Sequence, residues 1–102
     1  MKSKSSRKPS AKPLAKKARF KIRQPDAKSL VLVGSFTEWE AQAIPLAESE
    51  PGLWEVEIDL PSGRHEYLFI TGDGVWLQDP AAVESVANPF GGCNSVINIP
   101  RL

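Results

Sequence analysis

The sequence predicts an all-β sandwich, because short alternating segments recur along the chain with turn residues between them and no helical segment exceeds two turns. The clearest alternation runs from Leu53 to Leu60, where apolar residues alternate with Glu and Asp, as in a strand with one dry and one solvent-facing side. The second observation is a β-hairpin over residues 64–80. Residues 66–70 are aromatic and β-branched, the Gly-containing turn 71–74 follows, and residues 75–77 resume a strand.

The other elements follow from the same kind of pattern. Residues 19–23 alternate basic and apolar side chains and predict the first strand. The second predicted strand, residues 28–33, contains a run that is apolar on both faces, as expected inside a sandwich. Further along, the sequence predicts a short edge segment with a proline at 41–46, a turn at 48–52, a loop or single helical turn at 81–87, a Gly-rich loop at 88–94 and a last strand at 95–99.

Length and composition point to one small folded domain of ordinary globular type, with 102 residues, 41% hydrophobic and 25% charged. No apolar run is long enough for a membrane span or the core of a signal peptide, so we expect no membrane partner. The single cysteine, Cys93, excludes an internal disulfide framework and favours a reducing, cytoplasmic location. One Cys and one His cannot form the usual structural metal cluster, so we expect no metal and no cofactor.

The charge is distributed unevenly. Residues 1–19 contain eight of the 13 basic residues and none of the 12 acidic ones, so the rest of the chain is acidic. Residues 1–18 also lack bulky apolar side chains, and we predict a disordered basic tail there, followed by a folded domain at 19–102. A solubilising or tethering role for the tail is favoured. The alternative is an arm for nucleic acid or another acidic partner, although no aromatic residue precedes Phe20 to stack on bases.

Residues that could perform catalysis do not form a catalytic pattern. His65 and Glu66 are neighbours in a strand and therefore face opposite sides of the sheet. Cys93 has no second histidine to activate it. Asp73 and Asp79 occupy a turn and a strand end, which are common structural positions for aspartate. We therefore predict that the chain is not an enzyme.

The aromatic residues divide into two groups. Five fall in core-like alternation, where packing is the default explanation: Phe20, Phe36, Trp54, Tyr67 and Phe69. Trp39 and Trp76 instead lie in or beside loops with polar or Gly neighbours, and Phe90 lies in the Gly-rich loop. An indole that the core does not need presents a flat apolar face with one polar group to a partner. The pattern alone leaves open whether these three side chains are exposed.

Several short motifs, in order along residues 18–100, resemble one family. They resemble carbohydrate-binding module family 48, which includes the glycogen-binding domain of the AMP-activated protein kinase β subunit and the N-terminal early-set domain of isoamylase and branching enzyme. Each motif alone is weak, and their combination is specific. The matching segments are Val33–Trp39, Gly52–Trp54, Leu60–Gly63, Tyr67–Phe69, Asp73–Trp76, Asp79–Pro80 and Asn88–Val96.

The resemblance implies an immunoglobulin-like, early-set antiparallel β-sandwich without catalytic activity. It also implies a shallow site for α-1,4-linked glucans such as glycogen, starch or maltooligosaccharides. By position, Trp39 and Trp76 match the two sugar-stacking tryptophans of the family. Phe90 matches the apolar residue around which the glucan wraps, and Asn94 matches an asparagine that binds sugar hydroxyls.

The sequence departs from the family pattern at the carbohydrate-binding positions Leu68 and Gly92, where glycogen-binding relatives carry a lysine and a threonine. The hairpin turn at residues 71–74 is also one residue longer. These changes remove polar contacts. The alternative reading is therefore a protein-interaction or regulatory module of the same fold with a degenerate sugar site, whose partner is a glucan-metabolising enzyme or another protein.

Overall fold

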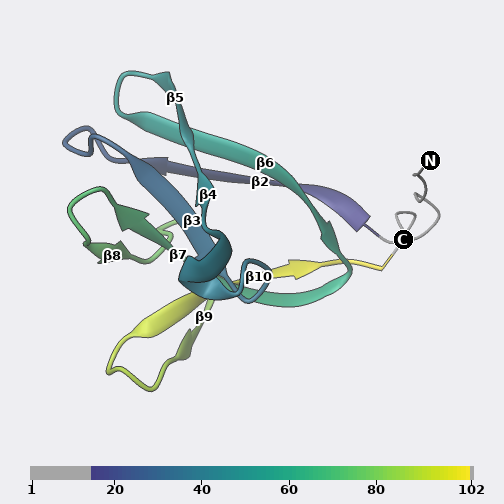
Figure 1. The fold of residues 1–102 in the computed structure, drawn as a ribbon. Coiled ribbons are helices and arrows are strands. Elements are labelled where there is room, and N and C mark those ends of the chain that lie inside the picture. Colours follow the sequence, from purple (N-terminus) through teal and green to yellow (C-terminus); the bar gives the residue numbers. More distant parts are fainter. Residues whose placement is uncertain (1–14, 102) are drawn as a thin grey trace, which may run out of the picture.

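The computed structural model describes residues 15–101 as two antiparallel β-sheets packed face to face (Figure 1). The smaller sheet has the order β2–β6–β5, and the larger sheet has the order β4–β3–β7–β10–β9, with β8 also paired to β7. The predicted all-β, immunoglobulin-like antiparallel sandwich is confirmed. The bounds are β2 Ala15–Arg23, β3 Leu30–Gly34, β4 Ile44–Pro45, β5 Ala47–Glu50, β6 Leu53–Pro61, β7 Gly63–Thr71, β8 Trp76–Leu77, β9 Glu84–Ala87 and β10 Cys93–Ile99, with one 3-10 helix, η2, at Trp39–Gln42.

Strand β7 is the centre of the larger sheet, since it pairs with β3, β10 and β8. The chain reaches it from β6 by crossing between sheets at residues 61–63, where Gly63 has a φ of 128° that side-chain-bearing residues rarely adopt. Successive side chains along β7 point to opposite faces of the sheet. Tyr67 and Phe69 point between the sheets, and Leu68 and Ile70 point to the opposite face of the larger sheet.

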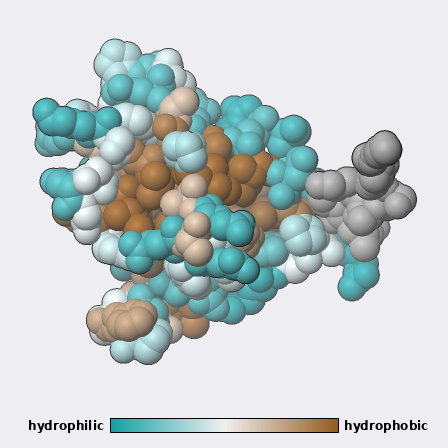
Figure 2. Space-filling view, viewed as in Figure 1, coloured by the Kyte–Doolittle hydropathy of each residue, from teal (hydrophilic) through white to brown (hydrophobic). Residues whose placement is uncertain are grey.

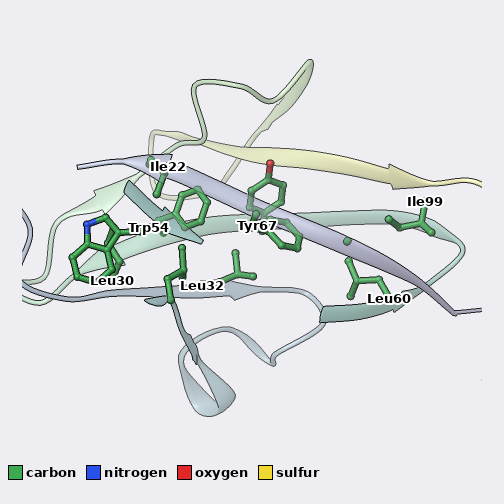
Figure 3. Close-up of a cluster of buried hydrophobic side chains, with 11 residues drawn as sticks. Ile22, Leu30, Leu32, Trp54, Leu60, Tyr67 and Ile99 are labelled. Atoms are coloured by element: carbon green, nitrogen blue, oxygen red, sulfur yellow. The ribbon is translucent and has the colours of Figure 1, made fainter. Parts of the chain in front are cut away.

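The core lies between the two sheets (Figure 3), where Trp54 and Leu30 lie at one end of the apolar cluster and Leu60 and Ile99 lie at the other. Residues from both sheets fill it, since Phe20 comes from β2 and Trp54 from β6. In Figure 2 the apolar residues form a band across the middle of the molecule with hydrophilic residues above and below. Each fully buried large apolar side chain contributes about 1.5–3 kcal/mol to folding.

Four of the five aromatics expected in the core are buried, and Phe36 is half-buried, with its ring centroid 5.9 Å from that of Phe20.

Strand β2 begins at Ala15 rather than at the predicted Arg19, so the predicted tail boundary at residue 18 is wrong. Ala18 is buried opposite Ile58 of β6, and Lys17 lies 3.9 Å from Asp59 across the same pair of strands. The inward-facing residue in this part of β2 is an alanine, which has a low β-propensity. The sequence therefore does not show the alternation that predicts a strand before Arg19. The prediction of disorder for residues 1–14 concerns residues outside those that the structure describes.

Two segments predicted as turn or loop contain strands instead. Strand β5 covers most of the predicted turn at 48–52, and β9 covers the second half of the predicted loop at 81–87. Both are edge strands, and nearly every side chain in them is exposed. With both faces open to solvent, neither segment needs the apolar alternation from which a strand is recognised. No helix among residues 15–101 is long and apolar enough to cross a membrane.

A partly buried hydrogen bond connects the core to the segment after β8. The Tyr67 hydroxyl donates to Asp79 Oδ2 at 2.6 Å, and the Asp79 backbone N–H donates to Ser95 Oγ at 2.9 Å. Burial, followed by the hydrogen bond to Asp79, raises the pKa of the Tyr67 hydroxyl far above its usual range.

This pKa shift predicts a loss of stability in alkali. Because the folded protein favours the neutral phenol, the contribution of Tyr67 is complete below its unfolded pKa of about 10 and is lost as the pH rises above that value. Tyr67 is the only tyrosine, so Tyr67→Phe is expected to remove this part of the pH dependence. Thermal melts of both proteins between about pH 8 and pH 11 measure it. Equal slopes for the two proteins would contradict the assignment.

Candidate functional site

A second apolar cluster lies on the outer face of the larger sheet. Val33, Leu68 and Ile70 form its buried centre, and Trp39 packs against them. The outer face of the smaller sheet is charged instead, with cross-strand pairs such as Arg19 and Glu57 at 2.9 Å. Apolar surface on an otherwise solvent-facing sheet commonly marks a binding site.

Trp39 is placed over this cluster by a strained turn after β3. Glu38 and Trp39 have φ values of 54° and 57°, a left-handed conformation that costs a non-Gly residue on the order of 1–3 kcal/mol. The buried Thr37 hydroxyl stabilises the turn, because its oxygen accepts from the Gly34 backbone N–H at 2.9 Å and it donates to the Trp39 carbonyl at 2.8 Å. The half-buried indole is therefore held in a defined position.

The other two aromatic side chains come from different hairpins. Trp76 lies in β8 opposite Ile70 and is 46% exposed, and Phe90 lies at the tip of the β9–β10 hairpin and is 92% exposed. The hairpin tip is fixed by Asn88, whose Oδ1 accepts from the backbone N–H groups of Phe90 at 2.9 Å and Gly92 at 3.1 Å. A side chain as large and exposed as Phe90 contributes little to the core, yet the loop that carries it is held by these side-chain hydrogen bonds.

These elements surround one open groove of about 920 Å³. In Figure 1, η2, β8 and the β9–β10 hairpin lie together below the smaller sheet. The groove brings together every residue that the sequence and resemblance nominated: Trp39, Leu68, Trp76, Phe90, Gly92 and Asn94. Leu68 is buried beneath the groove as part of its floor. The sugar-binding roles assigned to these residues stay predictions.

Asn94 has structural partners as well as a place in the groove. It is only 7% exposed, its Nδ2 donates to Glu66 Oε1 at 3.0 Å, and its Oδ1 accepts from Asn88 Nδ2 at 3.1 Å. Asn94 therefore links β7 to the loop that carries Phe90. One N–H and one lone pair of its amide remain for a ligand.

Glu66 and Asn88 line the groove and were not predicted as site residues. Glu40, Gln78, Pro89 and Cys93 complete the lining. A signal for Glu66 was present, because strand alternation places Glu66 on the same face as Leu68. The role of Asn88 depends on the conformation of its loop, which residue pattern alone does not define.

Of the residues considered for catalysis, only Glu66 and Cys93 line the groove, and His65, Asp73 and Asp79 lie outside it. His65 Nε2 lies 2.9 Å from the Pro61 carbonyl oxygen, and Asp79 is bonded to Tyr67. Asp73 lies in the β7–β8 turn, and the half-buried Cys93 has no histidine beside it in the groove lining. Among residues 15–101, no three His, Cys, Asp or Glu side chains are arranged to hold a metal ion.

The fold and the groove together define a β-sandwich binding module with an aromatic surface site. The family model described as the glycogen recognition site of AMP-activated protein kinase matches residues 17–101. The chain belongs to this family of carbohydrate-binding modules, and the resemblance noted in the sequence is confirmed. The match is to a binding module rather than to a catalytic domain.

Known relatives place the module within larger proteins. The chain is 33% identical over 75 residues to the 1,4-alpha-glucan branching enzyme GlgB 2 of Xanthomonas campestris, covering 70% of this chain and 10% of that protein. It is 34% identical over 87 residues to the 1,4-alpha-glucan branching enzyme GlgB of Mesorhizobium japonicum, covering 79% of this chain and 12% of that protein. The chain thus spans only about a tenth of the length of these curated relatives.

The fold also occurs in a solved structure. The enterobactin esterase Fes of Shigella flexneri matches with a TM-score of 0.67 at 14% identity, covering 84% of this chain and 30% of that one. At this low identity the match supports the fold alone.

Proposed function

We propose that this chain is a non-catalytic module that binds α-1,4-linked glucans, such as glycogen, starch or maltooligosaccharides, in the groove of the larger sheet. The observation that carries the proposal is the gathering of Trp39, Trp76 and Phe90 around one groove. These residues come from separate segments, and Trp76 and Phe90 are exposed rather than packed in the core.

Sugar chemistry fits the groove in two ways. The C–H faces of glucose rings are apolar and stack on indoles, and by analogy with base stacking each contact contributes about 1–3 kcal/mol. Glucose hydroxyls need hydrogen-bond partners, and the carboxylate and amide groups of Glu66, Gln78 and Asn94 lie in the same lining. The open groove, of about 920 Å³, also has room for a chain rather than a single ring.

The expected affinity is weak. Two indole stacks and a few hydrogen bonds supply a favourable binding free energy, and the entropy lost on binding reduces it. The remainder corresponds to dissociation constants on the order of micromolar to millimolar. The branching-enzyme relatives suggest that a glucan-metabolising enzyme is the partner whose substrate the module holds.

Titration of the protein with maltoheptaose, followed by tryptophan fluorescence and calorimetry, tests the proposal. We expect saturable binding, with the fluorescence change arising from Trp39 and Trp76 because Trp54 is buried in the core. Cellohexaose, whose β-1,4 linkage gives a straight chain, is the control and should bind at least about tenfold more weakly, a difference of 1.4 kcal/mol. No heat at millimolar maltoheptaose and no retention on starch would refute glucan binding and favour the protein-interaction alternative.

A further inference from the structure

The charged side chains that line the groove are both acidic. They are Glu40 and Glu66, and among the lining residues within the part of the chain that the structure describes there is no Lys, Arg or His. Just outside the lining, Arg64 lies 3.5 Å from Glu66 and 3.2 Å from Glu84. Arg64 is shared between the carboxylates of Glu66 and Glu84, so one positive charge faces two negative charges. The surroundings of the groove therefore carry a surplus of negative charge.

Glu66 is held in position from several sides. Its Oε1 accepts from Asn94 Nδ2 at 3.0 Å and its Oε2 accepts from Arg64 at 3.5 Å. Its backbone N–H donates to Ser35 Oγ at 3.2 Å, and its carbonyl accepts from the Ser35 N–H at 2.9 Å. The side chain is 34% exposed. A carboxylate has about four lone-pair sites, so acceptor capacity remains on the groove side after these contacts.

We propose that Glu66 is the specificity-determining residue of this groove and makes it select uncharged α-glucans over phosphorylated ones. The carboxylate accepts hydrogen bonds from glucose hydroxyls, and such charge-assisted bonds are stronger than those between neutral groups. A phosphate ester is itself an anion with acceptor oxygens, and among residues 15–101 the groove lining offers it no cation. This inference rests on the proposed function.

The electrostatic effect is large enough to measure. Two like unit charges about 4 Å apart in a fully hydrated site, here a carboxylate and a phosphate, repel each other enough to lower the affinity for the ligand about fivefold. Partial burial increases this repulsion. Salt screens the interaction over about 10 Å at 0.1 M ionic strength. Discrimination against phosphate should therefore be strongest in dilute buffer.

The test compares maltoheptaose with maltoheptaose 6-phosphate on the wild-type protein and on Glu66→Gln. Wild type is expected to bind the phosphorylated sugar at least about fivefold more weakly than the neutral one at low salt. Glu66→Gln keeps the size and an acceptor oxygen for Asn94 but removes the charge. It should bind maltoheptaose more weakly and show a smaller difference between the two sugars.

The matched control is Glu57→Gln, which removes a surface carboxylate on the smaller sheet, away from Arg64 and outside the groove lining. It should leave the ratio between the two sugars unchanged. Equal affinity of wild type for both sugars, or the same ratio in Glu66→Gln as in wild type, would overturn the inference while leaving glucan binding intact. A wild-type protein that binds neither sugar would instead refute the proposed function. Thermal melts of each variant show whether a lost signal comes from unfolding.

Discussion

Trp54→Ala is expected to lower the free energy of unfolding by about 3–5 kcal/mol, the range for removing a large aromatic side chain from a core. Trp54 is 6% exposed, and its indole N–H donates to the Gln24 carbonyl at 3.1 Å. Truncation therefore leaves a cavity at one end of the core and removes a hydrogen bond that connects β6 to the loop after β2. Since small domains are stable by only about 5–15 kcal/mol, this single change brings the protein near unfolding.

Chemical denaturation followed by circular dichroism measures this effect. Glu57→Ala, on the solvent side of the same strand, is the control. Its carboxylate pairs with Arg19 at the surface, where such ion pairs contribute about 0–1 kcal/mol. Similar losses from Trp54→Ala and Glu57→Ala would mean that the two faces of β6 are wrongly assigned.

Trp76→Ala is expected to weaken maltoheptaose binding at least about tenfold, equivalent to 1.4 kcal/mol, with little change in stability. Trp76 lies in a two-residue strand at the sheet margin and nearly half of its surface is exposed, so the fold depends little on it. Trp39→Ala should weaken binding similarly but should also destabilise the protein. Trp39 packs against the cluster of Val33, Leu68 and Ile70.

Calorimetric titrations and thermal melts of the same samples separate the two effects. Trp76→Phe, which keeps a flat apolar ring, should retain part of the affinity. Wild-type affinity in Trp76→Ala would exclude this indole from the site. A large fall in its melting temperature would show that it is a structural residue.

The elements with a core face were predictable from the sequence. In β6 the alternation of Trp54 and Leu60 with acidic residues corresponds to the buried and open faces of that strand. In β7 Tyr67 and Phe69 were expected in the core, but the pattern is apolar on both sides, so alternation alone could not show what the second apolar face is for. The second apolar cluster explains that ambiguity, because the outer face carries the groove floor.

The features that sequence reasoning missed depend on tertiary partners. Strands β5 and β9 exist because neighbouring strands supply their hydrogen bonds, not because their own residues alternate. The left-handed turn at Glu38 and Trp39 is held by the Thr37 hydroxyl. The link from Glu66 through Asn94 to Asn88 joins residues far apart in the chain. Single-residue patterns contain no information about such pairs.

The groove is assembled on one strand from three distant segments, and this arrangement has a thermodynamic consequence. The three segments that form the groove are η2, which follows β3, the short strand β8, and the β9–β10 hairpin. All three are connected to β7, because β3, β8 and β10 each pair with that strand. No segment presents the groove alone, so the binding-competent state is the fully folded state. A ligand that contacts all three segments therefore acts on the global folding equilibrium by mass action. At a concentration of 100 times its dissociation constant, such a ligand adds about 2.7 kcal/mol to the stability of the whole domain.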